Sequence, residues 1–191
     1  QLDKTFPTLD CSACILTPKM VSVSQHPNIT LLAYSAVEKV GGFPGNISVT
    51  VRRKATYVDH DICNGCGLCQ EKCPAKTSNP FEQDKTTRKA IYTLFPQAIP
   101  NKPVIDKSSC IYFTKGKCGA CQKLCPREAI DFSQEDRFEE FSVGAIIVAT
   151  GHEIFDGSRL DSYGYGRYPD VYNALEFERM VNFGGYTNGR I

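Results

Sequence analysis

The sequence predicts an α+β protein in which a small cysteine-rich module interrupts an α/β domain. Three features of the 191-residue chain indicate this architecture: a unit of four cysteines that occurs twice, an alternating apolar segment before it, and a continuous apolar segment after it. A chain of this length can form one medium domain or two small ones. We place the module at residues 56–134, between flanking segments 1–55 and 135–191.

The charge balance and the short apolar runs exclude several functional classes. The chain has 22 Lys and Arg against 21 Asp and Glu, so it has no positive excess for binding nucleic acid or an anionic membrane. The longest apolar run, residues 143–149, is far shorter than the ~20 residues of a membrane span. No secretory signal opens the chain, so we expect a cytoplasmic location. Because it begins with Gln1 rather than Met, we expect a piece of a longer protein.

Eight of the ten cysteines follow one spacing pattern. The first set runs from Cys63 to Cys73 as C-x2-C-x2-C-x3-C and is followed by proline. The second set begins at Cys110, about 47 residues after Cys63, and ends with the same C-x2-C-x3-C-P pattern from Cys118 to Pro126. A short apolar–Asp pair precedes both sets by the same step. We interpret the two sets as an internal duplication.

This spacing is typical of ferredoxins that hold two [4Fe-4S] clusters. Three cysteines at two-residue intervals, helped by Gly65 and Gly67, let a loop curve around one corner of a cubane. The fourth cysteine precedes a proline, where we expect a short helix to start, and it points toward the other cluster. The predicted ligands of one cluster are Cys63, Cys66, Cys69 and Cys125, and those of the other are Cys110, Cys118, Cys121 and Cys73.

Structural zinc and disulfides are the alternatives to iron–sulfur clusters. Zinc sites use separate C-x2-C pairs, and three cysteines at successive two-residue gaps followed by Cys-Pro fit them poorly. Five disulfides would suit a secreted chain, but the spacing follows the ferredoxin pattern instead. Measuring iron and acid-labile sulfide per chain separates these alternatives, because only iron–sulfur clusters contain both.

The segment before the module has the features of a small sheet. Residues 29–34 are rich in strand-forming side chains, and residues 37–40 continue that pattern. A Gly/Pro/Asn cluster at residues 41–46 then precedes strict alternation over residues 47–52. We therefore expect a strand at 29–34 and a β-hairpin that ends with a half-buried strand.

The segment after the module predicts a buried strand and a helix. Residues 143–151 form a continuous apolar strand that should be covered on both faces, as in a parallel sheet. It ends at Thr150 and Gly151, where a backbone without a side chain can approach a ligand. Residues 170–183 should form a helix with a capping pair, Asn173 and Glu176. No G-x-G-x-x-G or P-loop occurs, so we expect the phosphate-binding loop upstream of Gln1.

With these parts placed, the chain resembles the A subunit of heterodisulfide reductase, an iron–sulfur flavoprotein family of methanogenic archaea and their relatives. The most specific stretches are QLDKTFPTLDCSACILTPKM at 1–20, RKAIY at 88–92, FPQA at 95–98 and YGYGRYP at 163–169. The wider resemblance is to flavoproteins of the thioredoxin-reductase type. In these, Thr150 and Gly151 look like the strand-end motif beside FAD, and the backbone around Val37 would lie near the adenine.

The resemblance implies a function for the whole protein. Residues 1–55 and 135–191 would belong to a partial α/β FAD-binding domain of the thioredoxin-reductase type, into which the ferredoxin module is inserted. The two clusters would conduct electrons in an electron-bifurcating oxidoreductase subunit that couples CoM-S-S-CoB reduction to ferredoxin reduction. The implied partners are the other heterodisulfide reductase subunits, a hydrogenase or formate dehydrogenase, and ferredoxin.

Two alternative functions remain beside the first. One is the related quinone-linked oxidoreductase subunit of sulfate reducers, which shares the layout of the chain. The other is a soluble ferredoxin-type electron carrier, against which the strands on both sides of the module argue.

Cys11 and Cys14 form a C-x2-C pair outside the duplication. They could be ligands of a further cluster completed by residues outside this chain, a thiol pair near the flavin, or buried cysteines packed in a loop. Thioredoxin-type redox activity needs a helix N-terminus directly after the first cysteine, and the sequence does not indicate one. Of the histidines, His60 reads as part of a solvent-facing turn and His152 as a loop residue that could approach the flavin.

Overall fold

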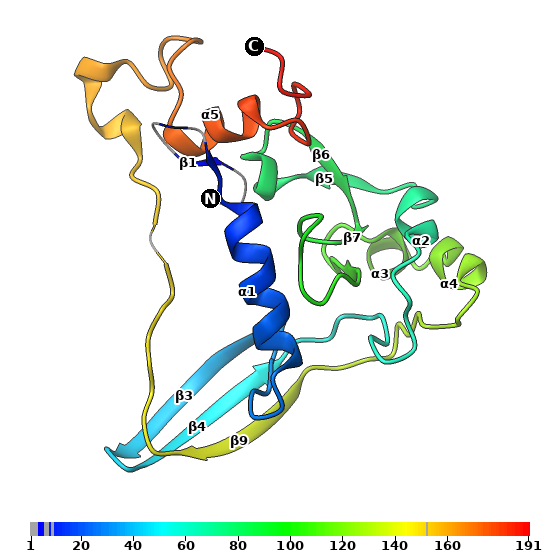
Figure 1. The fold of residues 1–191 in the computed structure, drawn as a ribbon. Coiled ribbons are helices and arrows are strands. Elements are labelled where there is room, and N and C mark those ends of the chain that lie inside the picture. The colour runs from blue at the N-terminus through cyan, green and yellow to red at the C-terminus, as the bar shows by residue number, and fades with distance from the viewer. Residues whose placement is uncertain (1–3, 6–7, 9, 152) are drawn as a thin grey trace. The chain divides into compact units, whose positions relative to one another are not determined.

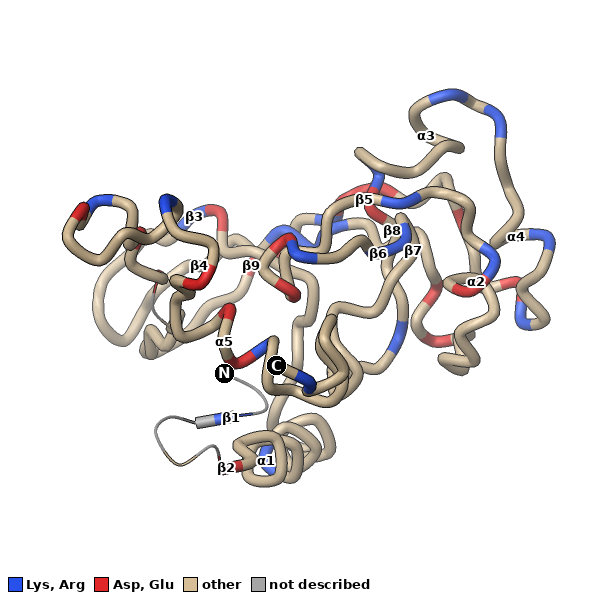
Figure 2. Tube along the Cα trace, turned by 90° about the horizontal axis from the view of Figure 1, so that it is seen from above, with Lys and Arg blue, Asp and Glu red and all other residues tan. Residues whose placement is uncertain are grey.

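The computed structural model describes residues 4–5, 8, 10–151 and 153–191, and the chain divides into two compact units. The terminal unit comprises residues 1–19, 78–86 and 148–191, and the central unit comprises residues 20–77 and 87–147. His152 and part of the segment 1–20 lie outside the described residues. Figure 2 shows that Lys and Arg are interspersed with Asp and Glu along much of the trace.

A three-stranded antiparallel sheet forms one part of the central unit (Figure 1). Its order is β3 (Ser35–Phe43), β4 (Asn46–Arg53) and β9 (Arg137–Val143). The β3–β4 pair is the predicted hairpin. Val37 pairs with Val51, the register shifts at an irregularity between Val37 and Lys39, and the pairing then continues to Phe43 opposite Asn46. Val49 and Val51 of β4 are buried, as the alternation predicts, because β4 is the middle strand.

The strand predicted at residues 29–34 is wrong. These residues form irregular structure and a turn, and the strand begins only at Ser35. Tyr34 has a left-handed backbone with φ 55°, which interrupts an extended chain. Side chains with β propensity form a strand only when a neighbouring strand pairs with them.

The continuous strand predicted at residues 143–151 is also wrong. Strand β9 ends at Val143, where its pairing with Ile47 at the start of β4 also ends. The apolar residues beyond it are exposed, Ile147 at 93% and Val148 at 78%. A run of apolar residues therefore does not extend the strand once the neighbouring strand turns back.

The rest of the central unit contains the two cysteine repeats. The short elements are α2 (Leu68–Glu71), β7 (Ile91–Tyr92), β8 (Val104–Ile105), α3 (Ile111–Lys115) and α4 (Ala120–Leu124). Strands β7 and β8 pair antiparallel, and an isolated bridge joins Val58 to Ile130. One buried cluster underlies all of them and contains Ala55, Tyr57, Val58, Cys69, Ala75, Ala90, Ile91, Ile105, Cys110, Ala129 and Ile130.

The duplication is visible in the backbone hydrogen bonds. The amide of Asp59 donates to the carbonyl of Ala129 at 2.7 Å, and the amide of Asp106 donates to the carbonyl of Ala90 at 2.8 Å. Each Asp thus precedes one cysteine repeat and is bonded to an Ala of a buried Ala-Ile pair. The same local pairing supports both repeats.

The terminal unit contains a small hairpin and the last helix of the chain. Strand β1 (Lys4–Thr5) pairs with β2 (Asp10–Cys11), and the 13-residue helix α1 (Ala13–Gln25) begins in this unit. Short 3-10 turns lie at η1 (Pro80–Glu82), η2 (Gly157–Arg159) and η3 (Asp161–Tyr163).

The predicted C-terminal helix is present but shorter than residues 170–183. It is α5 (Ala174–Val181), and Asn173 and Glu176 form a complete capping box at its start. The side chain of Asn173 accepts from the amides of Leu175 and Glu176, and Glu176 accepts from the amide of Asn173. The capping prediction is confirmed because these contacts are local in sequence.

The strands β5 (Lys76–Ser78) and β6 (Thr87–Lys89) pair with each other and complete the set of elements. Among the described residues, no helix has the length and apolar character that crossing a membrane would require.

Candidate metal centres

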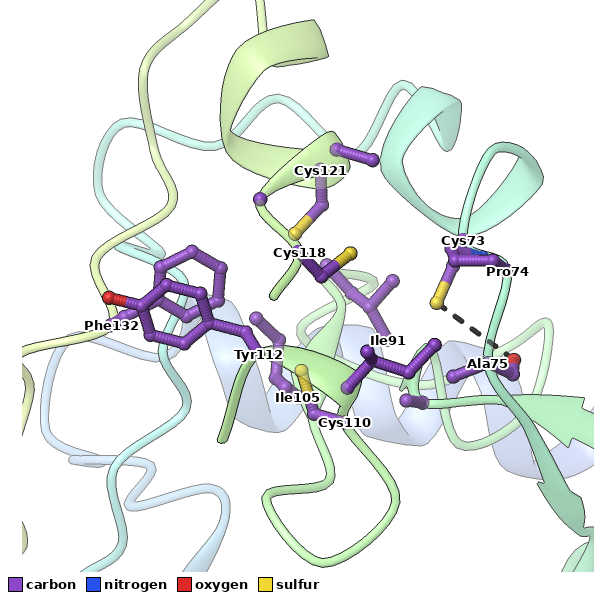
Figure 3. Close-up of a pocket in the computed structure, with 14 residues that line it drawn as sticks. Cys73, Pro74, Ala75, Ile91, Ile105, Cys110, Tyr112, Cys118, Cys121 and Phe132 are labelled. Atoms are coloured by element: carbon purple, nitrogen blue, oxygen red, sulfur yellow. Dashed lines mark hydrogen bonds between the residues drawn. The ribbon is translucent and has the colours of Figure 1, made fainter. Parts of the chain in front are cut away.

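Two cavities in the central unit are lined by cysteines. The first is bordered by Cys73, Cys110, Cys118 and Cys121. Figure 3 shows these four side chains around one shared space, with their sulfur atoms directed into it. Apolar side chains complete the wall, among them Ile91, Ile105, Tyr112 and Phe132.

The second cavity has a similar composition. Its cysteines are Cys63, Cys66, Cys69 and Cys125. Val58, Pro103, Ala129 and Ile130 contribute apolar surface to its lining.

The two cavities exchange one cysteine between the repeats. Cys73 ends the first repeat but lines the cavity of the second, and Cys125 ends the second repeat but lines the cavity of the first. The structure therefore brings together the same two quartets that the spacing groups. That these sulfurs bind clusters stays a prediction.

An Asp turn positions the first cysteine of each repeat. The amide of Cys63 donates to the carbonyl of Asp59 at 2.9 Å, and that of Cys110 donates to the carbonyl of Asp106 at 3.0 Å. The carboxylates accept from backbone amides two residues later, from Asp61 at 2.8 Å and from Ser108 at 3.0 Å. These Asp turns close the loop in front of each cavity. Their sequence signal is the Asp that precedes both repeats by the same step.

Glycines at positive φ shape the first loop. Gly65 has φ 73°, and a Cβ there would lie 2.9 Å from the carbonyl oxygen of Asn101. Gly67 has φ 80° and precedes α2 directly. A side chain at Gly65 would thus be both strained and crowded beside the second cavity.

The helix expected after the fourth cysteine is wrong: the helices lie before it. Helix α2 ends at Glu71 and α4 at Leu124, so that Cys73 and Cys125 follow them in non-helical backbone. Cys125 has φ −76° and ψ 110° because a following proline disfavours the helical conformation. This extended backbone carries the fourth cysteine of each repeat away from its own helix.

Burial in the two cavities disfavours the ionised, thiolate form of their cysteines. Burial, together with the nearby Cys63, raises the pKa of Cys69 to about 11. Burial likewise raises the pKa of Cys121 to about 12, with Cys110 contributing. Without a positively charged occupant these cysteines keep their protons at neutral pH, so cluster binding must release protons.

The residues present fit iron–sulfur clusters. Each cavity offers four soft sulfur donors in an apolar wall, which is the donor set that iron–sulfur clusters use. Backbone amides also point at sulfur: Ala129 donates to Cys125 Sγ at 3.3 Å and Gly65 to Cys63 Sγ at 3.4 Å. Hydrogen bonds of this kind tune cluster potentials. None of the ten cysteines is in a disulfide bond.

Aromatic rings cover one side of the first cavity. Tyr112 stacks on Phe132 with ring centroids 3.8 Å apart, and Phe113 packs against both rings. Phe113 also lies 4.5 Å from Tyr57 of the buried cluster, measured between ring centroids. These rings reduce the access of water to that cavity.

The residues expected near FAD line neither cysteine cavity. Val37 is 62% exposed on β3 of the central unit. Thr150 and Gly151 are exposed in irregular backbone of the terminal unit, where Gly151 has φ 79°. His60 lies in a turn, as expected, but it is half-buried rather than solvent-facing, and its Nε2 lies 3.0 Å from the carbonyl oxygen of Pro103.

Comparisons with known proteins agree with this geometry. Residues 56–77, which contain the first repeat, match the family of 4Fe-4S binding domains. Over all 191 residues the chain is 47% identical to the A subunit of the H(2):CoB-CoM heterodisulfide,ferredoxin reductase of Methanothermobacter thermautotrophicus, of which it covers 28%. It is 50% identical to one of the iron-sulfur A subunits of the CoB--CoM heterodisulfide reductase of Methanopyrus kandleri, again covering 28%.

A third relative is the A subunit of the Ferredoxin:CoB-CoM heterodisulfide reductase of Methanosarcina mazei. The identity is 44% over the whole chain, which covers 24% of that protein. The chain thus spans about a quarter of the length of the curated relatives it matches. Along its whole length, this chain is homologous to one segment of the A subunits of the heterodisulfide reductase family.

Proposed function

We propose that this chain is the electron-transferring segment of an oxidoreductase component, the A subunit of a heterodisulfide reductase, and that it holds two [4Fe-4S] clusters. The observation that carries the proposal is the exchange of Cys73 and Cys125 between the two cavities. A crossed arrangement of this kind is the ligation pattern of two-cluster ferredoxins. The ligands would be the two cysteine quartets that line the cavities.

We also propose that residues 56–134 are an insertion into a partial FAD-binding domain formed by residues 1–55 and 135–191. An insertion requires that its two ends lie side by side. The hydroxyl of Thr56 donates to Oε1 of Gln134 at 3.3 Å, and the amide of Ala55 donates to Oδ1 of Asp136 at 2.9 Å. The ends of the module therefore meet, which supports an insertion with FAD bound by the full-length protein.

Each cavity would surround its cluster with its own set of sulfur ligands, amide donors and apolar side chains. When bound, a cluster supplies one-electron transfer without a change in ligands. The chain's own contribution is to fix the four sulfurs, to direct amides such as that of Ala129 at them, and to limit water with Tyr112 and Phe132. These are the features by which a protein sets a cluster potential.

The activity of the whole protein is part of this proposal. The names of the relatives refer to the CoB-CoM heterodisulfide, to ferredoxin and, in one case, to H2. We infer that the clusters conduct electrons to or from a flavin that divides them between CoM-S-S-CoB reduction and ferredoxin reduction. The other reductase subunits, a hydrogenase or formate dehydrogenase, and ferredoxin would be the partners. A quinone-linked subunit or a soluble ferredoxin-type carrier remains the alternative.

The crossed ligation can be tested by four single substitutions in the full-length protein. Under anaerobic conditions, Cys73→Ser should remove or alter the same electron paramagnetic resonance signal as Cys110→Ser. Cys125→Ser should affect the same signal as Cys63→Ser, because those two sulfurs line one cavity. Iron and acid-labile sulfide are measured in parallel for each variant.

The four variants control one another, since each removes one cysteine. If Cys73→Ser matched Cys63→Ser instead, the clusters would not be crossed. A protein that contains zinc and no labile sulfide would refute the cluster assignment altogether.

A further inference from the structure

Cys11 and Cys14 lie at the start of a helix. Strand β2 ends at Cys11 and helix α1 begins at Ala13, so the expectation that no helix follows the first cysteine is wrong. The first turn of the helix is formed by the amides of Ile15 and Leu16, which both donate to the carbonyl of Ser12. Cys11 therefore stands at the N-terminus of a 13-residue helix, and Cys14 lies in its first turn.

The two sulfurs are neighbours on an exposed surface. Sγ of Cys14 donates a hydrogen bond to Sγ of Cys11 at 2.9 Å. Both cysteines are exposed, which contradicts the idea that they are packed away in a loop. Neither of them lines the two cysteine cavities. A disulfide bond of about 2.05 Å would require the sulfurs to approach by less than 1 Å.

The surroundings shift the pKa values of the two thiols in opposite directions. The hydrogen bond from the Cys14 side chain lowers the pKa of Cys11, and the amides of Cys14 and Ala13 and the charge of Lys4 act in the same direction. Lys4 is the direct β-strand partner of Cys11. The same hydrogen bond and the charge of Cys11 raise the pKa of Cys14. Such asymmetry at a helix N-terminus is typical of C-x2-C pairs in thiol–disulfide exchange.

We propose that Cys11 and Cys14 form a redox-active dithiol that exchanges with exposed or low-molecular-weight disulfides. The Cys11 thiolate attacks one sulfur of the substrate disulfide, whose S–S bond breaks, and the first thiolate leaves and takes up a proton. The Cys14 thiol then loses its proton and attacks the Cys11 sulfur, releasing the second thiol. The products are a Cys11–Cys14 disulfide and two substrate thiols, so two electrons and two protons leave the pair.

This chemistry is independent of the proposed clusters, because neither sulfur lines their cavities. The proposed exchange predicts a different role for each of the two sulfurs. Cys11 is the attacking sulfur and Cys14 the resolving one, which follows from the direction of their hydrogen bond. An isolated pair of metal ligands would show no such order of reaction.

The test uses the full-length, cluster-loaded protein under anaerobic conditions with glutathione disulfide as the probe. After differential alkylation and trypsin digestion, both sulfurs are read from the peptide of residues 5–19, which contains no other cysteine. We expect this peptide to become lighter by two hydrogen atoms and to resist alkylation, while the iron content stays unchanged. Dithiothreitol should restore two reactive thiols.

Single substitutions separate the roles of the two sulfurs. Cys14→Ser should trap a glutathione mixed disulfide on Cys11, whereas Cys11→Ser should slow mixed-disulfide formation at Cys14 at least tenfold. Ser24→Ala, at the far end of the same helix, is the matched control and should react like the natural protein. Equal rates for the two variants, or thiols that stay alkylatable, would overturn the proposal. A loss of iron in either variant would do so as well, because it would make the pair cluster ligands.

Discussion

Asp106 links the first cysteine of the second repeat to an ion pair. Its carboxylate accepts from Arg88 Nη2 at 2.9 Å and from the hydroxyl of Ser108 at 2.6 Å. Partial burial disfavours its charge, but hydrogen bonds from Ser108, Arg88 and Ser109 outweigh that effect and lower its pKa to about 2. Since the carbonyl of Asp106 also accepts from Cys110, this carboxylate stabilises the loop that positions a predicted ligand.

We predict that Asp106→Asn destabilises the full-length protein in a pH-dependent way. A carboxyl with a lowered pKa contributes stability above its unfolded pKa of about 3.9 and loses it as pH falls toward the folded value near 2. The difference in unfolding free energy from the natural protein should be about 2 kcal/mol above pH ~5 and should shrink below it. Denaturant unfolding at several pH values measures this.

Asp131 provides the control for that substitution. It accepts from the amide and hydroxyl of Ser133 at 2.9 and 2.6 Å, much as Asp106 accepts from Ser108, but it is exposed. Asp131→Asn should therefore cost less. A pH-independent difference for Asp106→Asn would contradict the role of its charge.

A second residue-scale prediction concerns Gly65 and Gly67. Both have positive φ, but only at Gly65 would an added Cβ meet a neighbour, the carbonyl oxygen of Asn101 at 2.9 Å. Gly67→Ala should cost about 1–2 kcal/mol from backbone strain alone. Gly65→Ala should cost more and should lower iron occupancy of the cavity that contains Cys63.

Iron content per chain and denaturant unfolding report the two effects separately. Equal occupancy in Gly65→Ala and Gly67→Ala would show that crowding at Asn101 does not matter.

At the scale of elements, residues 76–89 interrupt the first repeat. In the second repeat, the buried pair Ala129-Ile130 begins four residues after Cys125. In the first repeat, residues 76–89, which we call the arm, lie between Cys73 and the equivalent Ala90. Its ends pair as β5 and β6, and its tip belongs to the terminal unit. The arm therefore has a structural role outside the cysteine module.

The tip of the arm binds helix α5 through a buried ion pair. Oε1 of Glu82 accepts from Nε and Nη2 of Arg179 at 3.1 and 2.6 Å, and the two side chains are only 9% and 5% exposed. The Arg179 guanidinium also lies 4.5 Å from the ring centre of Phe81. A second, half-exposed pair joins Lys85 to Glu176 at 2.9 Å.

We predict that Glu82→Ala destabilises the terminal unit strongly, by about 3–5 kcal/mol, because it removes one carboxylate partner from a buried guanidinium, that of Arg179. Lys85→Ala, which removes the more exposed partner, should cost only about 0–1 kcal/mol. Limited proteolysis near α5 and denaturant unfolding of the full-length protein measure both.

The double variant Glu82→Leu, Arg179→Met is the decisive control. Apolar replacement of a buried ion pair is often neutral, so this variant should recover most of the loss. Failure to recover would mean that packing around Phe81, rather than the loss of the Glu82 carboxylate, causes the effect.

At the scale of the whole molecule, local patterns predicted local structure well. The hairpin around Gly42 and the capping box of Asn173 form as expected, because their determinants lie within a few residues. The cysteine grouping also agrees with the spacing, since Cys73 and Cys125 each line the cavity of the other repeat.

The two strand errors share one cause. Residues 29–34 and 143–151 have strand-like composition, yet strands form only where a neighbouring strand offers its backbone, and that partner is distant in sequence. The helix after Cys11 was missed because Pro18 and the β-branched residues near it suggested a loop. The partnership of Glu82 with Arg179 joins residues 97 apart, and no periodicity in the sequence signals it.

The sequence by itself determined which cysteines belong to the repeats, how they divide into two quartets, and which family segment the chain resembles. Spacing is sufficient for this because a loop of a few residues has few ways to surround a cubane. Only the tertiary structure decided where strands end, that Cys11 and Cys14 face each other at a helix start, and that an arm of the first repeat holds α5. Those features depend on contacts between distant segments, whose free energy no local pattern encodes.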